Sequence, residues 1–510
     1  MSAAATPADP TPTGSIPADL APADDGRLPS RTRVALGLLL AATFVVFLNE
    51  TTMSVAIPDI MKDLGVTPAL GQWLTTAFAL TMAVVIPVTG WLLQRLDTRP
   101  VFILALALFS AGTLLAALAP SFGVLIAARV VQGSGTAVMM PLMMTSVLTL
   151  VPMQSRGRFM GRVSIVLSVA PAIGPAISGL ILRFTDWRGL FWVMLPIALV
   201  MLVIGIARVP NVSELRRVPL DALSVVLSAF AFSGLVYGLS SIGQAAQGTA
   251  LVAQWIPLAI GGVFLLLFVL RQLALQKRDA AFLDLRTFRA RTFTVSVVLL
   301  MIGMVSLFGM VFVLPIYAVN VLGLEELQTG LILLPGGLLM GLLGPVVGRL
   351  FDRVGPRPLV IPGVLIVSAV FWGLTMLSEQ TPWPFLLAAH LTLSVGLAFL
   401  FTPLFTAGLG ALPPHLYSHG SATLATLQQV AGAAGAALFA AFLTIGVTAA
   451  GAADPNVANP TELAAGVRLA FLTGAIVSLA LIPVAFLVRR PAEPEVRDED
   501  LETGAIPVTH

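Results

Sequence analysis

The sequence of 510 residues is 57% hydrophobic and only 10% charged, whereas an average soluble protein is about 25% charged. This composition excludes most soluble enzymes and nucleic-acid-binding proteins, and indicates a chain that lies mainly in lipid. The net charge is only +3, and cysteine is absent, which excludes disulfide bonds and thiolate metal sites. Neither lysine, Lys62 or Lys277, follows a glycine, so the chain lacks the phosphate-binding loop of ATP-driven proteins.

The first 33 residues are rich in Ala, Pro, Thr and Asp and lack the basic start and apolar core of a signal peptide. We predict that residues 1–33 form a disordered tail. From residue 34 onward, fourteen apolar runs are each long enough to cross ~30 Å of hydrocarbon, which predicts an all-α polytopic membrane protein with 14 transmembrane helices. The predicted spans are residues 34–58, 70–94, 101–119, 124–150, 159–182, 190–207, 222–243, 256–271, 292–318, 329–350, 359–378, 385–411, 423–447 and 466–488.

The basic residues predict how these spans are oriented in the membrane. Of the 28 Lys and Arg residues, 23 lie in the two tails and in the loops after even-numbered spans. The opposite loops hold only Lys62, Arg183, Arg188 and Arg468. Because positive charge is enriched on the cytoplasmic side, both termini are predicted to be cytoplasmic in a multi-pass protein of the plasma (inner) membrane.

A repeated segment indicates internal symmetry. PVTGWLLQRLDTRP at residues 87–100 and PVVGRLFDRVGPRP at residues 345–358 are identical at seven of fourteen positions, and they close predicted spans two and ten. A six-span repeat would return at span eight, so two additional spans lie between the halves. The predicted domains are a cytoplasmic tail (1–33), a six-helix bundle (34–207), two inserted helices with a basic linker (208–291), a second six-helix bundle (292–488) and a second cytoplasmic tail (489–510).

Two parallel six-helix halves around a central cavity are typical of secondary transporters, whose substrate site lies near the membrane midplane. Five segments add a family resemblance: LNETTMSVAIP (48–58), RVVQGSG (129–135), APAIGPAISG (170–179), GRLFDRVGPRP (348–358) and LPPHLYSHGSATLATLQQVAGAAGAALF (412–439). With these segments the chain resembles the major facilitator superfamily and, within it, the fourteen-span drug:proton antiporters of EmrB/QacA type. The last segment is similar to the lincomycin-resistance (LmrB-type) branch.

The resemblance implies a major facilitator fold and proton-coupled efflux (antiport) of hydrophobic drugs by alternating access. The proton gradient takes the place of a cofactor. The implied partners are a small hydrophobic substrate, protons and the lipid bilayer, with no nucleic acid, and we expect the monomer to be functional. An alternative is a dedicated exporter of one endogenous metabolite, lipid or antibiotic.

A membrane enzyme is an alternative of another class. It would use His390, or the pair His415 and His419, which stand four residues apart in a predicted loop opened by two prolines. No paired acid or metal cluster accompanies these histidines within the predicted spans, and no acidic or thiol ligand stands near the pair. We therefore expect neither enzymatic chemistry nor a metal site.

Glu50 is the only acidic residue placed deep in a predicted span. A carboxylate there costs about 2.5–3.5 kcal/mol on insertion scales, which makes it a functional candidate. Burial favours its neutral form and a nearby cation favours its ionised form, and this balance suits a proton carrier. Arg129 lies at a similar depth, about 9–12 Å from the outer ends of the spans, and the resemblance supports a coupling role for both residues. In most members of the family that the chain resembles, an Asp occupies the position of Asn49, so the acid of this chain stands one position later. The alternatives to a coupling role are a structural ion pair between Glu50 and Arg129, or an Arg129 whose side chain snorkels outward.

Candidate substrate-binding residues lie on several spans. Gln132 and Thr136 follow Arg129 on one helix face, and methionines 139, 140, 143 and 144 continue it as flexible, polarizable side chains. The alternative for each methionine is helix packing or lipid contact, and the alternative for the intramembrane His390 is a satisfied packing residue. Trp73 and Phe312 could stack on a planar or cationic drug, and the alternative for them is interface anchoring or core packing. The candidate set is Asn49, Trp73, Gln132, Thr136, Met140, Phe312, His390, Gln428 and Gln429.

The repeated loop segments suggest a conformational switch. Asp352 and the arginines around it can form a charge network that latches one conformation. In the first copy Gln94 occupies the position of Asp352, and Asp97 is a candidate to replace the missing acid. The alternative is that the arginines of the first copy are only topology signals. The candidate switch residues are Gly90, Arg95, Asp97, Arg99, Gly348, Asp352, Arg353 and Arg357.

Span five combines two prolines with two glycines. Such residues bend a membrane helix and allow a neighbouring helix to approach closely. In the family that the chain resembles, this motif marks exporters rather than importers. The candidate residues are Pro171, Gly174, Pro175 and Gly179.

Overall fold

The computed structural model describes residues 28–212, 215, 219–246, 253–452 and 458–489. Over these residues the protein is all-helical, and fourteen helices are long and apolar enough to cross a membrane, which confirms the predicted fold class. The long helices are α1 (Ser30–Leu64), α3 (Trp73–Arg95), α4 (Thr98–Ala117), α5 (Phe122–Leu150), α6 (Arg156–Leu182), α7 (Arg188–Arg208), α8 (Ala222–Ala246), α9 (Trp255–Leu275), α10 (Arg291–Asn320), α11 (Glu326–Val354), α12 (Arg357–Leu374), α13 (Trp383–Gly410), α14 (Tyr417–Ala449) and α15 (Pro460–Leu479). The short helices are α2 (Pro68–Gly71), α16 (Leu481–Ala485), η1 (Met153–Ser155), η2 (Gln276–Arg278), η3 (Leu285–Arg289) and η4 (Pro414–Leu416).

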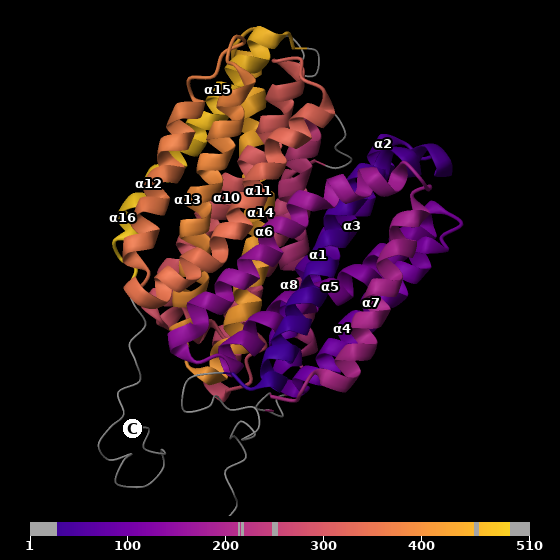
Figure 1. The fold of residues 1–510 in the computed structure, drawn as a ribbon, viewed down its shortest axis with the longest axis vertical. Coiled ribbons are helices and arrows are strands. Elements are labelled where there is room, and N and C mark those ends of the chain that lie inside the picture. The colour runs from indigo at the N-terminus through magenta and orange to yellow at the C-terminus, as the bar shows by residue number, and fades with distance from the viewer. Residues whose placement is uncertain (1–27, 213–214, 216–218, 247–252, 453–457, 490–510) are drawn as a thin grey trace, which may run out of the picture.

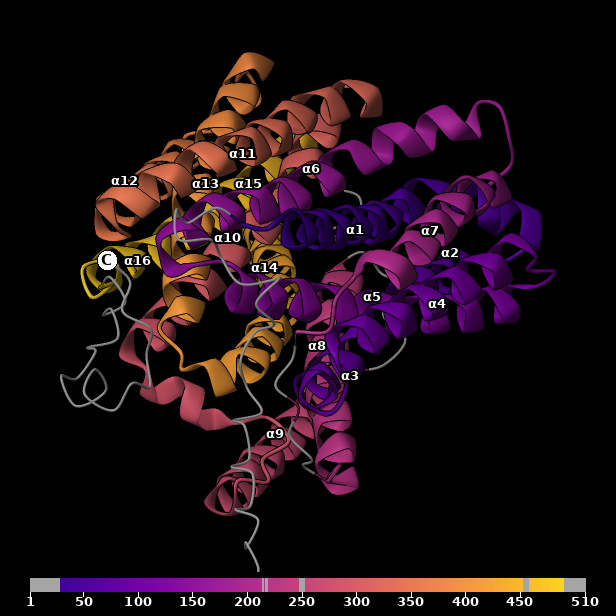
Figure 2. The ribbon, with the colours of Figure 1, turned by 60° about the horizontal axis from the view of Figure 1, so that its bottom comes forward.

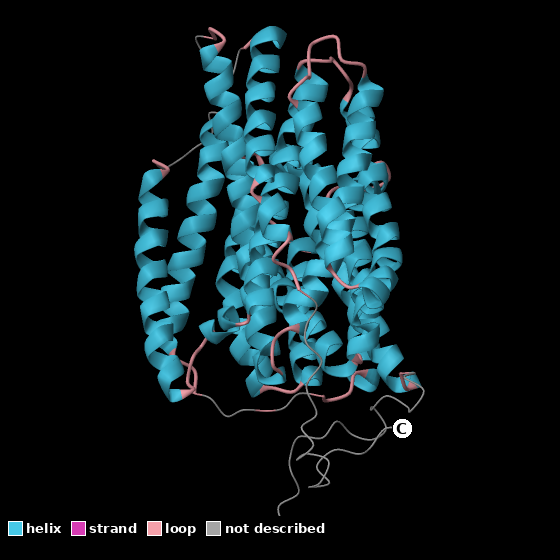
Figure 3. Ribbon diagram, turned by 90° about the vertical axis from the view of Figure 1, so that its left-hand side faces the viewer, coloured by secondary structure: helices cyan, strands magenta, loops and turns pink. Residues whose placement is uncertain are grey.

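Glycine and capping residues fix several helix ends. α1 ends at Gly65 with φ 63°, in the left-handed region that glycine adopts without strain. α15 begins with a capping box, in which Asn459 and Glu462 each accept a hydrogen bond from the backbone N–H of the other. Most loops gather at the two ends of the helices (Figure 3), as a membrane requires of backbone groups that lack helical partners.

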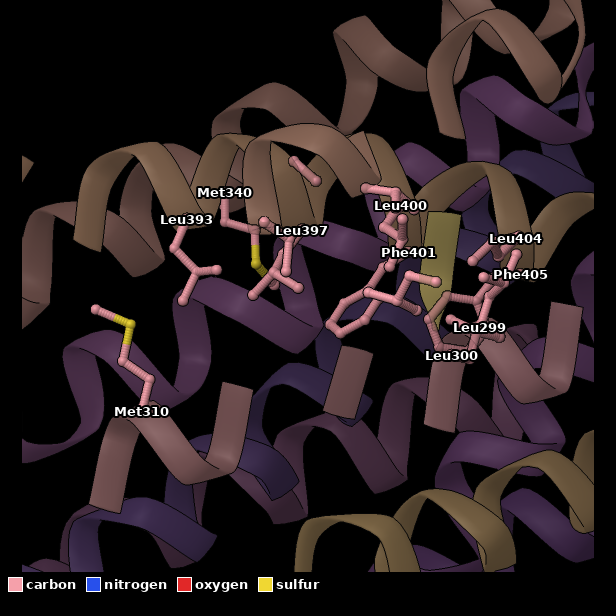
Figure 4. Close-up of a cluster of buried hydrophobic side chains, with 14 of the residues drawn as sticks. Leu299, Leu300, Met310, Met340, Leu393, Leu397, Leu400, Phe401, Leu404 and Phe405 are labelled. Atoms are coloured by element: carbon pink, nitrogen blue, oxygen red, sulfur yellow. The ribbon is translucent and has the colours of Figure 1, made fainter. Parts of the chain in front are cut away.

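The long helices form two bundles that lie side by side (Figure 1). In the first bundle α4 packs against α5 and α7, and in the second α10 packs against α13 and α14. Each bundle has an apolar core. Figure 4 shows part of the second core, where Leu299 and Leu300 of α10, Met340 of α11, and Leu393 and Leu397 of α13 are buried.

The helices α8 and α9 stand beside the bundles (Figure 2). They pack against each other where Gly234 meets Gly261, because the absence of side chains lets the backbones touch. α8 also contacts α3 and α14, one helix from each bundle. α9 leaves large apolar side chains such as Val263, Leu266 and Leu270 exposed, which is typical of a helix that faces lipid.

α1 begins and α16 ends at the same end of the molecule, at the bottom of Figure 1. We call this end the terminal face. Two seams join the bundles: α6 against α11, and α3 against α14. In the α6–α11 seam a Cβ on Gly157 or on Gly348 would overlap the carbonyl oxygen of the other residue, and the same holds for Gly161 and Gly344. The two backbones are therefore in direct contact near the terminal face.

Candidate functional site

Glu50 and Arg129 lie within reach of each other's charge but do not form a close ion pair. Glu50, on α1, is half-buried, and Arg129, on α5, is only 1% exposed. The two side chains interact electrostatically. Across the part of the chain that the structure describes, no hydrogen bond or ion pair joins the Glu50 carboxylate to another side chain. The carboxylate therefore remains available to a proton.

Neutral groups hold the Arg129 guanidinium in place. Its Nε donates to the Leu74 carbonyl of α3 at 3.2 Å, and Nη1 donates to Gln132 Oε1 at 2.6 Å. The guanidinium carbon lies 4.0 Å from the centre of the Phe78 ring, a cation–π contact. Gln132 Nε2 in turn donates to the Thr113 hydroxyl of α4 at 2.8 Å. This network fixes the positive charge, and no carboxylate in the described part of the chain lies at contact distance from it.

The proline–glycine segment of α6 packs directly behind Glu50. A Cβ on Gly174 would overlap the Thr51 hydroxyl, so glycine is required for this approach of α6 to α1. The Ser178 hydroxyl donates to the Thr52 carbonyl at 2.8 Å. Asn49 is buried, and its Oδ1 has no hydrogen-bond partner among the described residues. Of the other motif residues, Pro171 and Pro175 lie inside α6, and a Cβ on Gly179 would meet open space.

The remaining substrate candidates are distributed over both bundles. Thr136 continues the polar face of α5 and donates to the Gln132 carbonyl at 3.1 Å. Gln429 of α14 donates to Met82 Sδ of α3 at 3.5 Å, and Gln428 beside it is half-buried. Met140 is buried and Phe312 is half-buried. The structure thus brings Gln132 and Thr136 together with Arg129 on α5, and places Gln429 at the α3–α14 seam.

Two candidates are engaged elsewhere. The Trp73 ring stacks on Tyr237 of α8, with ring centroids 5.8 Å apart. His390 lies between α13 and α11, where its Nε2 is 3.0 Å from the Leu333 carbonyl oxygen and its ring fills the space above Gly336. Its Nδ1 is buried without a hydrogen-bond partner in the described part of the chain.

The second copy of the repeated segment holds the α6–α11 seam together. The Asp352 carboxylate of α11 accepts hydrogen bonds from the backbone N–H groups of Gly157 at 2.8 Å and of Arg158 at 3.0 Å. These groups belong to the first turn of α6, where unpaired N–H groups favour a negative charge. Arg357 instead donates to the Phe486 carbonyl within its own bundle, and Arg353 is exposed.

The first copy makes the corresponding contact at the α3–α14 seam. Gln94 Nε2 lies 2.6 Å from His419 Nε2 and donates to the Ser418 hydroxyl at 3.3 Å. A Cβ on Gly90 would lie 3.3 Å from the Ala422 Cβ, so the helices are close here as well. The placement of His419 in a loop is wrong, because α14 already begins at Tyr417. From the sequence, His419 is a candidate only for enzymatic chemistry or a metal site, and its place at this seam was missed. The available signal was Gln94, which occupies the position of Asp352 in the first copy of the repeat.

The other residues of the first copy do not join this contact. Asp97 precedes α4, but its side chain makes no capping hydrogen bond. The backbone N–H of Arg99 donates to Asn211 Oδ1 at 3.3 Å, and Arg95 is exposed. Gln94 itself, rather than Asp97, therefore reaches across the seam.

The linker after α9 adds a third element to the α3–α14 seam. The backbone N–H of Asp284 donates to His419 Nδ1 at 3.4 Å. The Asp284 carboxylate, only 4% exposed, accepts from Arg286 at 2.6 Å. Burial alone raises the pKa of Asp284. The hydrogen bonds that Arg286 donates, together with the electrostatic interaction with His419, outweigh burial and hold that pKa below its ordinary value. Leu283 packs toward Gly90, so the linker covers the seam.

Further polar contacts between the bundles lie in the same half of the molecule. Arg156 of α6 donates to the Tyr417 hydroxyl at 3.2 Å, and the Thr145 hydroxyl donates to Ser421 at 3.3 Å. No group of three His, Cys, Asp or Glu residues converges on a common metal position within the described ranges. The arrangement is a carboxyl group and a guanidinium inside the first bundle, together with two seams that are closely packed at the terminal face. We call these two packed seams the gate.

Comparisons with known proteins agree on one family. The family model described as Major Facilitator Superfamily matches residues 39–436. The chain is 38% identical over 467 residues to the MFS-type transporter YcnB of Bacillus subtilis (strain 168), covering 91% of this chain and 97% of that protein. It is 39% identical over 457 residues to the lincomycin resistance protein LmrB of the same strain, covering 89% and 95%. The solved structure of the human organic anion transporter MFSD10 (TETRAN) has the same fold, with a TM-score of 0.64 at 16% identity over 90% of this chain and 99% of that one.

Proposed function

Because this chain belongs to the Major Facilitator Superfamily, we propose that it is a proton-coupled antiporter that exports hydrophobic drug-like molecules across the plasma membrane by alternating access. Membership of this family of transporters, and similarity to its LmrB-type branch, confirm the resemblance that the sequence predicts. The name of the LmrB relative supports a drug as the substrate. Two bundles that meet along two seams support the rocking motion that alternating access requires.

The terminal face is assigned to the cytoplasm, with both chain ends on that side. The assignment rests on the 23 of 28 basic residues that fall in the tails and in the loops after even-numbered spans. Direct backbone contact at Gly157 and Gly348, together with the seam hydrogen bonds, lies at this face. These contacts support a conformation that is closed to the cytoplasm and faces outward.

The observation that carries the proton step is Glu50, a half-buried carboxylate near a fixed cation and without an ion-pair partner at contact distance among the described residues. In the outward-facing state Glu50 takes a proton from outside, because its neutral form costs less within the membrane. After the bundles rock, the charge of Arg129 favours loss of the proton to the cytoplasm. The negative charge that remains then prepares the site for the next substrate.

The test is drug-driven proton movement in inside-out vesicles that contain the full chain. Glu50→Gln keeps the size and a hydrogen-bonding group but removes the titratable proton, so we expect lincomycin to cause no proton release while insertion is retained. The matched control is Glu379→Gln, which removes the same charge from an exposed loop residue and should leave coupling unchanged. Drug-driven proton release by Glu50→Gln at the wild-type rate would overturn the assignment.

Substrate range is a separate question with its own measurement. Cells that express the chain can be challenged with a lincosamide, a dye and a quaternary ammonium compound. Protection against all three supports multidrug efflux, because flexible apolar contacts accept varied shapes. Protection against a single chemical class supports the dedicated exporter instead.

A further inference from the structure

A pocket of about 530 Å³ opens at the terminal face between the ends of three helices of the first bundle. It is lined by the start of α1, by Arg99 at the start of α4 and by residues 207–210 at the end of α7. It lies apart from Glu50, since Glu50 stands twenty residues, about 30 Å, beyond the start of α1 at Ser30. The proposed proton and drug steps make no use of this pocket.

The pocket is strongly basic. Among the described residues that line it, three are arginines, Arg31, Arg99 and Arg208, and none is acidic. Arg99 Nε is shielded from solvent and has no hydrogen-bond partner among the described residues. Shielding a guanidinium donor without a partner is costly. α1 and α4 both begin here, and the positive ends of their helix dipoles add positive potential.

An apolar track leads from the pocket along the outer side of α7. Ile204 and Val200 stand four and eight residues before Arg208, on the same helix face, and both are exposed. Leu104, one turn further into α4 from the pocket, is exposed as well. A ligand with an anionic head and long apolar tails would match both the arginines and this track.

We infer that the pocket between the starts of α1 and α4 and the end of α7 binds the phosphodiester headgroup of an anionic phospholipid, with its acyl chains along α7. Arginine matches phosphate in geometry as well as in charge, through paired N–H donors. Basic pockets between membrane helices at the headgroup level are typical sites for anionic lipids. The bound lipid braces α1, α4 and α7 at the end where the bundles meet.

The test uses native mass spectrometry of the purified full chain with added phosphatidylglycerol or phosphatidylcholine. Wild type should retain phosphatidylglycerol in preference to phosphatidylcholine. Arg99→Gln with Arg208→Gln should lower phosphatidylglycerol retention about tenfold or more, because each arginine near an anionic surface contributes several-fold. The matched control is Arg278→Gln with Arg289→Gln, which removes two exposed charges at the same face and should retain the lipid as wild type does.

A second measurement on wild type keeps the proposal testable if the double variant is poorly folded. A photoactivatable phosphatidylglycerol should crosslink to peptides that contain residues 98–104 and 199–210. Crosslinks only elsewhere, or equal lipid retention by the Arg99/Arg208 and control variants, would overturn the proposal. Inorganic phosphate at millimolar concentration should leave the crosslinks in place. Stabilisation by phosphate without any preference for phosphatidylglycerol would instead assign the pocket to a free anion and refute the lipid.

Discussion

The two copies of the repeated segment make the same contact with different chemistry. In the second copy, Asp352 of α11 accepts hydrogen bonds from the backbone N–H groups of Gly157 and Arg158 in the first turn of α6. In the first copy, Gln94 of α3 meets His419 in the first turn of α14. Each copy thus holds the start of a helix in the opposite bundle. The contact of the second copy contains a carboxylate, whereas the contact of the first copy joins an amide to an imidazole.

This difference makes the two seams unequal. A carboxylate at a helix N-terminus gains from the helix dipole, and charge-assisted hydrogen bonds are about twice as strong as neutral ones. The α6–α11 seam also has direct backbone contact, whereas the α3–α14 seam depends partly on the linker through Asp284. We therefore expect α6–α11 to be the stronger latch of the closed gate and α3–α14 to open first.

The largest effect is expected from a side chain inserted into the stronger seam. Gly348→Val places a Cβ where the Gly157 carbonyl oxygen lies, so the seam cannot close without moving backbone. We expect drug efflux to fall by more than about tenfold, since overpacking costs about 1–3 kcal/mol or more. The readout is efflux together with the distance between spin labels at Gln154→Cys and His415→Cys, two exposed terminal-face positions in a chain with no native cysteine.

The control for this substitution lies on the same helix. A Cβ on Gly330 meets nothing within 4 Å, so Gly330→Val carries the same backbone and β-branching cost without the clash. Gly330→Val should export drug at nearly the wild-type rate and keep the wild-type distance between the two spin labels. Equal loss in both glycine variants would show that helix propensity, not the seam, limits transport.

A smaller effect is expected from removing the charge alone. Asp352→Asn keeps the shape but loses one acceptor and the favourable interaction with the α6 N-terminus, a loss of about 1.5–3 kcal/mol. We expect the spin labels to report at least a tenfold larger open population at the terminal face. Asp97→Asn is the control, because the Asp97 side chain caps nothing. An open population in Asp97→Asn as large as in Asp352→Asn would contradict the assignment of the latch.

The helices of this fold could be predicted because the length of each apolar run can be measured directly in the sequence. The start of α14 was missed: the span was predicted from residue 423, whereas the helix begins at Tyr417. Ser418, His419 and Ser421 are too polar to face lipid, but all three are buried by protein at the α3–α14 seam. Polar residues can continue a membrane helix where a neighbouring helix, rather than lipid, covers them. The hydropathy of the local sequence does not show which residues a neighbouring helix will cover.

The candidate site was predictable to a similar depth. Glu50 and Arg129 stand out because a charge within an apolar run is costly. Their partners do not stand out, since Leu74 and Phe78 meet Arg129 only after α3 and α5 pack together. Whether Glu50 carries the proton stays a prediction. The contact between Gln94 and the opposite bundle could be found only from the structure, because the repeat identifies the position of Gln94 but not the residues that it contacts.

The linker offers a test of why the weaker seam holds. Asp284→Asn removes the buried partner of Arg286 and should lower the free energy of unfolding by about 1–2 kcal/mol, measured by thermal melting. Because the pKa of Asp284 is lowered in the folded state, its stabilisation is complete above the unfolded value of about 3.9 and is lost as the pH falls through the lower folded value. The difference between wild type and variant should thus be constant from about pH 5 to 8 and shrink in acid.

The matched control for Asp284→Asn is a change at Asp279, the exposed carboxylate that pairs with the same arginine. Asp279 also contacts Arg286, at 2.7 Å, but its side chain is 75% exposed. Exposed pairs contribute about 0–1 kcal/mol, so Asp279→Asn should melt close to wild type. A larger effect in Asp279→Asn than in Asp284→Asn would place the stabilisation at the surface and remove the linker from the seam.

The smallest effect is expected at the contact between Gln94 and the start of α14. Gln94→Ala removes the hydrogen bond to Ser418 and the close contact with His419 Nε2, a loss of about 0.5–1.5 kcal/mol, so the open population measured by the same spin labels should rise only a few-fold. Combining Gln94→Ala with His419→Ala should cost less than the sum of the single changes, because both remove one shared contact. If Gln94→Ala opened the terminal face as far as Asp352→Asn does, the two seams would be equal, and charge would not set the order in which they open.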